Sequence, residues 1–239
     1  MRDTSKDDQI REPIKSWPES ERPREILLEK GADHLSDAGL IAILLRTGMA
    51  GKDVVQFARE LLDRFGGLSG LLRAPEKDLG EIKGIGPAKI AQLMAAREII
   101  KRQLRDSLKK SDMLTFQNPR IVFDYLQSSM GAHKKEVFKV LYLNAGNQLI
   151  DDEDLFQGTL NESAVYPREV AKRALEKNAY SIIIAHNHPS GLLQATDRDI
   201  SITRKLIKAL KTVDIKVLDH VIVTGNGCLS MRLDKLAEF

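Results

Sequence analysis

Apolar residues recur at helical spacing through the first half of the chain. Within Lys52–Phe65 they fall three or four residues apart, which is the period of an amphipathic helix. Gly66 supplies a stop at the end of this segment. Ser36 can cap an earlier apolar helix, and a long helix is expected to begin near Pro87, a residue suited to the first helical turn.

Beyond residue 117 the pattern changes to short apolar runs separated by helical segments. Strands are expected at four of these runs: Val137–Leu143, Gln148–Phe156, Ser181–Ala185 and Ile215–Thr224. Helices are expected at three amphipathic segments: Pro119–Gln127, Pro167–Lys177 and Thr196–Thr212. In Val137–Leu143, apolar residues occupy both alternating sets of positions, which predicts burial on both faces of this strand.

These patterns divide the chain into three parts. Residues 1–22 are polar and predict a flexible arm. Residues 23–110 predict an all-helical domain, with a basic linker around residues 108–112. Strands and helices interleave over residues 117–239, which predicts an α/β or α+β domain.

Composition narrows the class of protein. The chain is 42% hydrophobic and 30% charged, as in ordinary globular proteins. No apolar run approaches the roughly 18 residues of a membrane-spanning helix, and the charged N-terminus is unlike a secretion signal. The one cysteine, Cys228, excludes an intrachain disulfide and a cysteine-rich metal site. It follows a Gly225–Gly227 turn, which favours a structural role, and a cytoplasmic location without membrane contact is expected.

Residues 79–93 combine basic charge with a glycine turn. Residues 81–110 hold 8 basic and 3 acidic side chains, a surplus that attracts phosphate. Gly84 and Gly86 permit a tight turn and close backbone approach, and the following helix start can hold a phosphate oxygen. The segment resembles a helix-hairpin-helix motif, which implies sequence-independent DNA contact at four residues: Lys83, Gly84, Gly86 and Lys89. A turn used only for packing or for a protein partner is the alternative.

Two histidines follow the apolar run that ends at Ala185. If the extended conformation continues, His186 and His188 point to one side and Asn187 to the other. Asp199 can reach the same place from the first turn of the next helix. Two imidazoles and a carboxylate leave one tetrahedral position for water, which is the arrangement of a catalytic zinc site.

A simpler interpretation of this segment is a helix cap. Thr196 and Asp199 have the spacing of a capping box, and histidine pairs often only complete hydrogen bonds in turns. His220, beside Asp219 on the last long strand, is either a support for a metal ligand or a core histidine. His34 and His133 lie in no motif and are expected at the surface.

The surroundings of the histidines decide between these interpretations. His-x-His-Pro, six residues, a hydroxyl residue, two residues and Asp resemble the JAMM (MPN+) metalloprotease signature. Residues 186–191, 156–160, 167–170 and 219–223 resemble the RadC branch in particular. With the hairpin upstream, the resemblance covers roughly residues 20–230. It implies a cytidine-deaminase-like α/β domain of the JAMM/MPN type, with a mixed sheet, behind the helical domain.

The resemblance also implies roles for individual residues. Zinc is expected to be held by three side chains: His186, His188 and Asp199. Glu136 is expected to act as general base and acid, and Glu162 and Glu169 are the alternatives. Thr196 stands where the family normally has Ser, and Ala195 where RadC proteins commonly have Pro. Thr196 keeps a hydroxyl for a developing oxyanion, but its extra methyl group can misplace that hydroxyl.

Three functions therefore remain open. The first is a zinc-dependent hydrolase of peptide or isopeptide bonds, either free or localised to DNA. The second is a DNA-binding accessory protein of repair or recombination. The third is a metal-binding interaction module without catalysis. The chain shows no P-loop and no nuclease-like carboxylate cluster. The expected partners are a peptide or protein substrate and, through residues 79–93, DNA; the substrate and the oligomeric state do not follow from the sequence.

Overall fold

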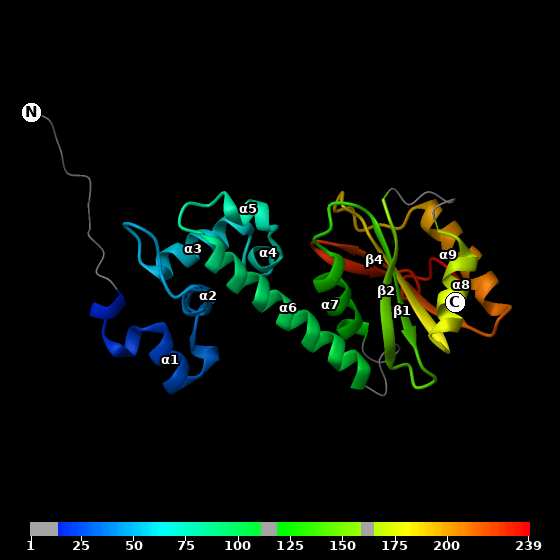
Figure 1. Ribbon diagram of the computed structural model, residues 1–239, viewed down its shortest axis with the longest axis horizontal. Coiled ribbons are helices and arrows are strands. Elements are labelled where there is room, and N and C mark those ends of the chain that lie inside the picture. The colour runs from blue at the N-terminus through cyan, green and yellow to red at the C-terminus, as the bar shows by residue number, and fades with distance from the viewer. Residues whose placement is uncertain (1–13, 111–118, 159–164) are drawn as a thin grey trace, which may run out of the picture. The chain divides into compact units, whose positions relative to one another are not determined.

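The computed structural model of the chain describes residues 14–110, 119–158 and 165–239 (Figure 1). The chain divides into two compact units, residues 1–97 and 98–239. Among the described residues, no helix combines the length and the apolar character needed to cross a membrane.

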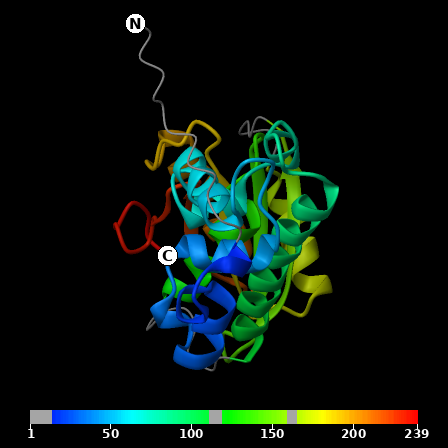
Figure 2. The same cartoon turned by 90° about the vertical axis from the view of Figure 1, so that its left-hand side faces the viewer.

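The first unit is helical, as the periodicity predicts. Its α-helices are α1 (Pro23–Lys30), α2 (Asp37–Leu45), α3 (Val54–Phe65), α4 (Leu68–Arg73), α5 (Glu76–Gly80) and the start of α6 (Pro87–Lys110) (Figures 1 and 2). Ser36 caps α2 by accepting a hydrogen bond from the N–H of Gly39 at 3.2 Å. Asp53, a cap that the sequence analysis did not identify, accepts from Val55 and Gln56 at 2.8 Å. Gly66 ends α3 in the left-handed conformation.

The borders of the first unit differ from the expected ones. Residues 14–22 form two 3-10 turns, and Ile14 and Trp17 pack against the helical core. The remainder of the expected arm, residues 1–13, lies outside the described residues. The linker prediction is wrong for residues 108–110, because α6 continues to Lys110 and Leu108 is buried in the core of the second unit. Residues 111 and 112 are not described.

The second unit is built on one mixed sheet. Its strands are β1 (Val137–Leu143), β2 (Leu149–Gln157), β3 (Ser181–Asn187), β4 (Lys216–Thr224) and β5 (Gly227–Ser230). Their order is β2-β1-β3-β4-β5, with β3 and β4 parallel and the other neighbours antiparallel. The four expected strands are confirmed within two residues at each end, and β5 was not predicted. The mixed-sheet α/β fold expected from the resemblance is confirmed.

Helices cover both faces of this sheet (Figure 1). Helix α7 (Pro119–Met130) and Leu108 pack with Ile183 and Ala185 on one face. Helices α8 (Pro167–Glu176) and α9 (Asp197–Lys211) pack with Ile182 and Ile184 on the other. Side chains of a strand alternate between faces, so the next even-numbered residue of β3, His186, faces the layer of α8 and α9.

Strand β1 is buried on both faces, including its lysine. Lys139 is 6% exposed, and its ammonium lies 3.1 Å from Asp152 and 2.6 Å from Asp154 on β2. Asp152 also accepts hydrogen bonds from Arg105 of α6 at 2.7 Å and from the Tyr125 hydroxyl of α7 at 2.7 Å. A buried lysine is tolerated here because its charge is paired and hydrogen-bonded.

Candidate metal centre

The end of β3 carries the two histidines of the predicted site. His186 is the next-to-last residue of the strand, and His188 follows directly after it. The N–H of His188 donates to the carbonyl of Val223 on β4 at 2.8 Å, so the extended course continues past β3. The expectation that His186 and His188 share one side, with Asn187 on the other, agrees with this geometry.

The first turn of α9 brings a carboxylate to the histidines. Thr196 accepts a hydrogen bond from the N–H of Asp199 at 3.3 Å, and Oδ2 of Asp199 accepts from the N–H of Thr196 at 2.7 Å. The capping box expected from the sequence is therefore present. Oδ1 of the same carboxylate lies 3.1 Å from Nε2 of His186. Asp199 thus caps the helix and faces the histidines at the same time.

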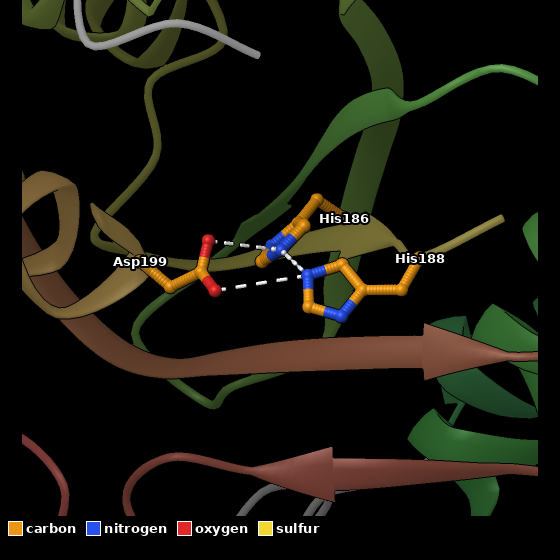
Figure 3. Close-up of side chains that lie close together, drawn as sticks. All are labelled: His186, His188 and Asp199. Atoms are coloured by element: carbon orange, nitrogen blue, oxygen red, sulfur yellow. Dashed lines mark hydrogen bonds and ion pairs between the residues drawn. The ribbon is translucent and has the colours of Figure 1, made fainter. Parts of the chain in front are cut away.

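Three side chains converge on one point (Figure 3). The Nε2 atoms of His186 and His188 are 2.8 Å apart, and Oδ2 of Asp199 lies 3.7 Å from Nε2 of His188. One ligand atom from each residue lies within 4.8 Å of the others, and no other such group occurs in the part of the chain that the structure describes. Two imidazole nitrogens this close must be bridged by a hydrogen or by a metal ion. Together with the carboxylate they fit a divalent metal with one position left open.

Hydrogen bonds outside the cluster set which atoms face it. Nδ1 of His188 lies 2.9 Å from the carbonyl of Leu192, which only accepts, so Nδ1 carries a hydrogen. The hydrogen bond with Asp199 raises the pKa of His188, the Leu192 carbonyl and the charge of Glu136 add to it, and burial opposes it. Burial acts to raise the pKa of Asp199, but hydrogen bonds with His186 and His188 hold it well below its usual range. The carboxylate is therefore ionised, as a metal ligand must be.

Glu136 lies beside the histidines, just before β1. Antiparallel pairing joins Phe138 to His186, and the charge of Glu136, two residues before Phe138, helps to raise the pKa of His188. Side-chain alternation gives Glu136 the same face as Phe138 and His186. Its carbonyl accepts a hydrogen bond from the N–H of Gly158 at 2.9 Å, and its side chain is half-buried. The charge of a carboxylate just before β1 therefore acts on one histidine of the candidate metal centre.

Asn187 ties the segment before β1 to β3. Its Oδ1 accepts from the N–H of Val137 at 2.8 Å, and its Nδ2 donates to the carbonyls of His133 and Lys135, each at 3.1 Å. The side chain is 1% exposed. These bonds fix the backbone on both sides of Glu136. The sequence analysis gave Asn187 no role, and no local pattern reveals one because its partners lie about fifty residues away along the chain.

The two alternative glutamates are differently situated. Glu169 lies in the first turn of α8, with its carboxylate 3.4 Å from Nε of Arg168 and a side chain 44% exposed. Glu162 lies outside the described residues. Among these three glutamates, the strand register at the histidines therefore favours Glu136.

The other histidines and the cysteine were also assigned from sequence. His34 and His133 are exposed, as expected. Cys228 is partly buried, its thiol lies 3.5 Å from the carbonyl of Phe123, and burial raises the pKa of the thiol to about 12. The structural role proposed for Cys228 fits these surroundings. His220 is 1% exposed, and its Nε2 lies 2.8 Å from Nδ1 of His186. Of the two interpretations of His220, this contact favours support of a metal ligand.

The glycine turn of the first unit has two different glycines. Gly84 has a φ of +92°, and a Cβ there would lie 2.8 Å from the Cβ of Met49. Gly86 has no such φ, and a Cβ there would meet nothing within 4 Å. Lys83 and Gly86 are exposed. The fold therefore requires glycine at position 84, whereas at position 86 the glycine leaves open space above the backbone.

Lys89 is turned into the first unit. Its ammonium donates to the carbonyls of Gly48 at 2.8 Å and Gly84 at 2.9 Å, and it lies 4.8 Å from the centre of the Phe57 ring. The side chain is 9% exposed, and desolvation lowers its pKa. This ammonium stabilises the turn and is directed into the first unit, which disfavours the phosphate contact expected for Lys89.

The fold and the site together define a class of α/β domains with a candidate metal centre at the end of a central strand. Residues 116–236 match the RadC-like JAB domain, and residues 14–91 match the UPF0758 N-terminal region. The chain therefore belongs to the family of UPF0758 proteins with a RadC-like JAB domain.

Curated relatives match over nearly the whole chain. A UPF0758 protein of Cellvibrio japonicus (strain Ueda107) is 51% identical over 94% of this chain and 97% of its own length. UPF0758 proteins of Acidovorax sp. (strain JS42) and Nitrosospira multiformis are 48% and 50% identical, over 92% and 91% of this chain and 97% and 96% of their own. These matches support the family resemblance inferred from the motifs.

Proposed function

We propose that the chain is a zinc-dependent hydrolase of the JAMM metalloprotease type, acting on peptide or isopeptide bonds. The observation that carries the proposal is the convergence of His186, His188 and Asp199 at the end of β3. The charge of Glu136, which acts on His188, supports it. A zinc ion held there supplies Lewis acidity, which lowers the pKa of water and polarises a carbonyl.

Each residue of the site has a distinct part in this proposal. The two Nε2 atoms and the Asp199 carboxylate bind the ion. Glu136 takes a proton from the attacking water and passes it to the leaving amine. Thr196 supplies a hydroxyl hydrogen bond to the developing oxyanion. In this structure the Thr196 hydroxyl donates to Oδ2 of Asp199 at 2.7 Å, so this role requires the hydroxyl to rotate.

Two substitutions test the proposal. The wild-type chain, reconstituted with zinc, should contain one zinc per chain by elemental analysis, and His186→Ala should lose it. Glu136→Gln should keep the zinc and lose turnover of isopeptide-linked and linear peptide libraries by about 10²- to 10⁴-fold. A wild-type chain that holds no zinc after reconstitution rules the proposal out. A zinc-loaded chain with no turnover of either library favours the non-catalytic interaction module.

A second function, sequence-independent DNA binding by residues 79–93, has one observation in its favour. The exposed Gly86 needs neither an unusual φ nor close packing, so close approach of a phosphate is a reason for a glycine there. The amides that begin α6 and the exposed Lys83 would contact the phosphate. A hydrolase localised to DNA and a DNA-binding accessory protein both follow from this contact.

Fluorescence anisotropy with a labelled duplex tests DNA binding. At 50 mM salt and tens of micromolar protein, the wild-type chain should bind, and affinity should fall as salt rises. Lys83→Glu and Gly86→Ala should weaken binding, with Lys77→Glu on α5 as a control of equal charge change. Absence of binding at 50 mM salt, or equal affinities for all of these variants, removes DNA from the proposed function.

A further inference from the structure

A chain of hydrogen bonds runs behind His186, on the side away from the cluster. Nδ1 of His186 lies 2.8 Å from Nε2 of His220 on β4. Nδ1 of His220 lies 2.5 Å from the hydroxyl of Thr203 on α9. The same hydroxyl lies 2.6 Å from the backbone carbonyl of Asp199, one turn earlier. His220 is 1% exposed and Thr203 fully buried.

The donor and acceptor properties of these groups determine which atom carries the hydrogen in each of these bonds. The Asp199 carbonyl only accepts, so the single hydrogen of the Thr203 hydroxyl points to it. That hydroxyl must then accept from Nδ1–H of His220. Neither hydrogen-bond contact of the buried His220 ring, the Thr203 hydroxyl or Nδ1 of His186, is a carboxylate that would balance a charge on it. The ring is therefore neutral, and its Nε2 is an acceptor. Nε2 of His220 therefore accepts from Nδ1–H of His186.

We propose that His220 and Thr203 are positioning residues of the metal centre. They hold His186 in the tautomer whose hydrogen is on Nδ1, which leaves the lone pair of Nε2 directed at His188 and Asp199. The inference rests on the proposed metal site and adds two residues that bind no metal themselves.

The effect on metal affinity is measurable, because an imidazole nitrogen that carries a hydrogen has no lone pair with which to bind a metal ion. If His220 carried its hydrogen on Nε2, it would donate toward Nδ1 of His186, and His186 would hold its own hydrogen on Nε2. Metal binding would then require that proton to be moved. Partners that fix the tautomer of a ligand histidine are commonly worth 10- to 100-fold in metal affinity.

Thr203 offers a test with a matched control. Thr203→Val removes the hydroxyl at nearly constant volume, and Thr203→Ser keeps it. Zinc affinity of the full-length chain is measured by competition with a chromophoric chelator. Thr203→Val should bind zinc at least about 10-fold more weakly than wild type, and Thr203→Ser should stay within about threefold. Circular dichroism of the metal-free variants verifies that each is folded.

A second measurement detects the tautomers directly. In the metal-free chain with ¹⁵N-labelled histidine, NMR should show hydrogen on Nδ1 of His220, with the same state in Thr203→Ser and a change toward Nε2–H in Thr203→Val. Equal zinc affinities of the two variants, or hydrogen on Nε2 of His220 in the wild type, overturns the inference. If the wild type binds no zinc, the proposed function fails, and the tautomer measurement alone decides this inference.

Discussion

At the scale of single residues, local sequence patterns predict some members of the site and not others. His186 and His188 follow from strand alternation, and Thr196 with Asp199 from capping-box spacing; all four lie where these patterns predict. Thr203 was not identified, because its partner His220 is brought near only by the packing of α9 against β4. The position of Glu136 was expected from the family resemblance alone and depends on the β1–β3 register.

The buried amide of Asn187 gives the first residue-scale prediction. Asn187→Ala removes three hydrogen bonds and leaves the Val137 N–H and two carbonyls without these partners. We expect a loss of about 3 kcal/mol in the free energy of unfolding, since each buried unsatisfied group costs about 1–3 kcal/mol before relaxation. Urea denaturation measures it. Asn226→Ala, at the exposed turn between β4 and β5 and without a positive φ, is a control for loss of an asparagine elsewhere. An unchanged unfolding midpoint would show that the three bonds contribute nothing.

At the scale of elements, apolar periodicity predicted most helices and strands but misplaced their borders. The linker prediction failed because residues 101–110 are polar and basic, whereas Leu108 alone is deeply buried there. Arg105 from the same helix pairs with Asp151 and Asp152 of β2. The basic, polar sequence thus conceals a helix that packs through Leu104, Leu108 and an ion-pair network.

The turn before α6 provides a matched pair of glycine substitutions. Gly84→Ala should lower the free energy of unfolding of the first unit by about 2 kcal/mol, because the residue has a φ of +92° and its new Cβ would clash with Met49. Gly86→Ala, in open space, should cost less than about 1 kcal/mol. Thermal denaturation compares the two variants. Equal destabilisation would contradict the assignment of a conformational role to Gly84 and not to Gly86.

The charges around Asp152 give a pH prediction. Burial opposes ionisation, but Lys139, Arg105 and Tyr125 lower the pKa of Asp152 overall. A lowered pKa adds stability that is fully present above the ordinary aspartate value, about 3.9, and is lost as pH falls through the lowered pKa. Asp152→Asn should cost about 3 kcal/mol at pH 7. Urea denaturation should show this cost shrinking below pH 4; a cost that is constant down to pH 3 would contradict it.

At the scale of the whole molecule, the division into a helical part and an α/β part was expected from the change of periodicity. The position of the division at residue 97, inside α6, was not. Periodicity cannot show it, because one uninterrupted helix contributes side chains to two separate cores. The mixed strand order, with β3 and β4 parallel in the middle, likewise depends on contacts between segments distant in the sequence.

Metal binding should stabilise one unit and not the other. The candidate ligands all lie within residues 98–239, so zinc at 100 times its Kd should add about 2.7 kcal/mol to the stability of that unit. Calorimetry of the full chain should show a higher Tm for the transition in which this unit unfolds. The Tm should return to its starting value after chelation of the zinc. His188→Ala should abolish the shift. A shift that survives this substitution would indicate zinc binding elsewhere.

Asp199 joins the candidate metal centre to the first turn of α9, because one carboxylate both caps the helix and faces the histidines. Helix ends open locally far more often than whole proteins unfold. Each such opening at α9 would withdraw a metal ligand, so release of the ion is expected to follow the fraying of this turn. Amide hydrogen exchange at residues 199–203 should therefore slow when zinc binds. The lifetime of the bound metal then depends on a helix cap as much as on the strength of its ligands.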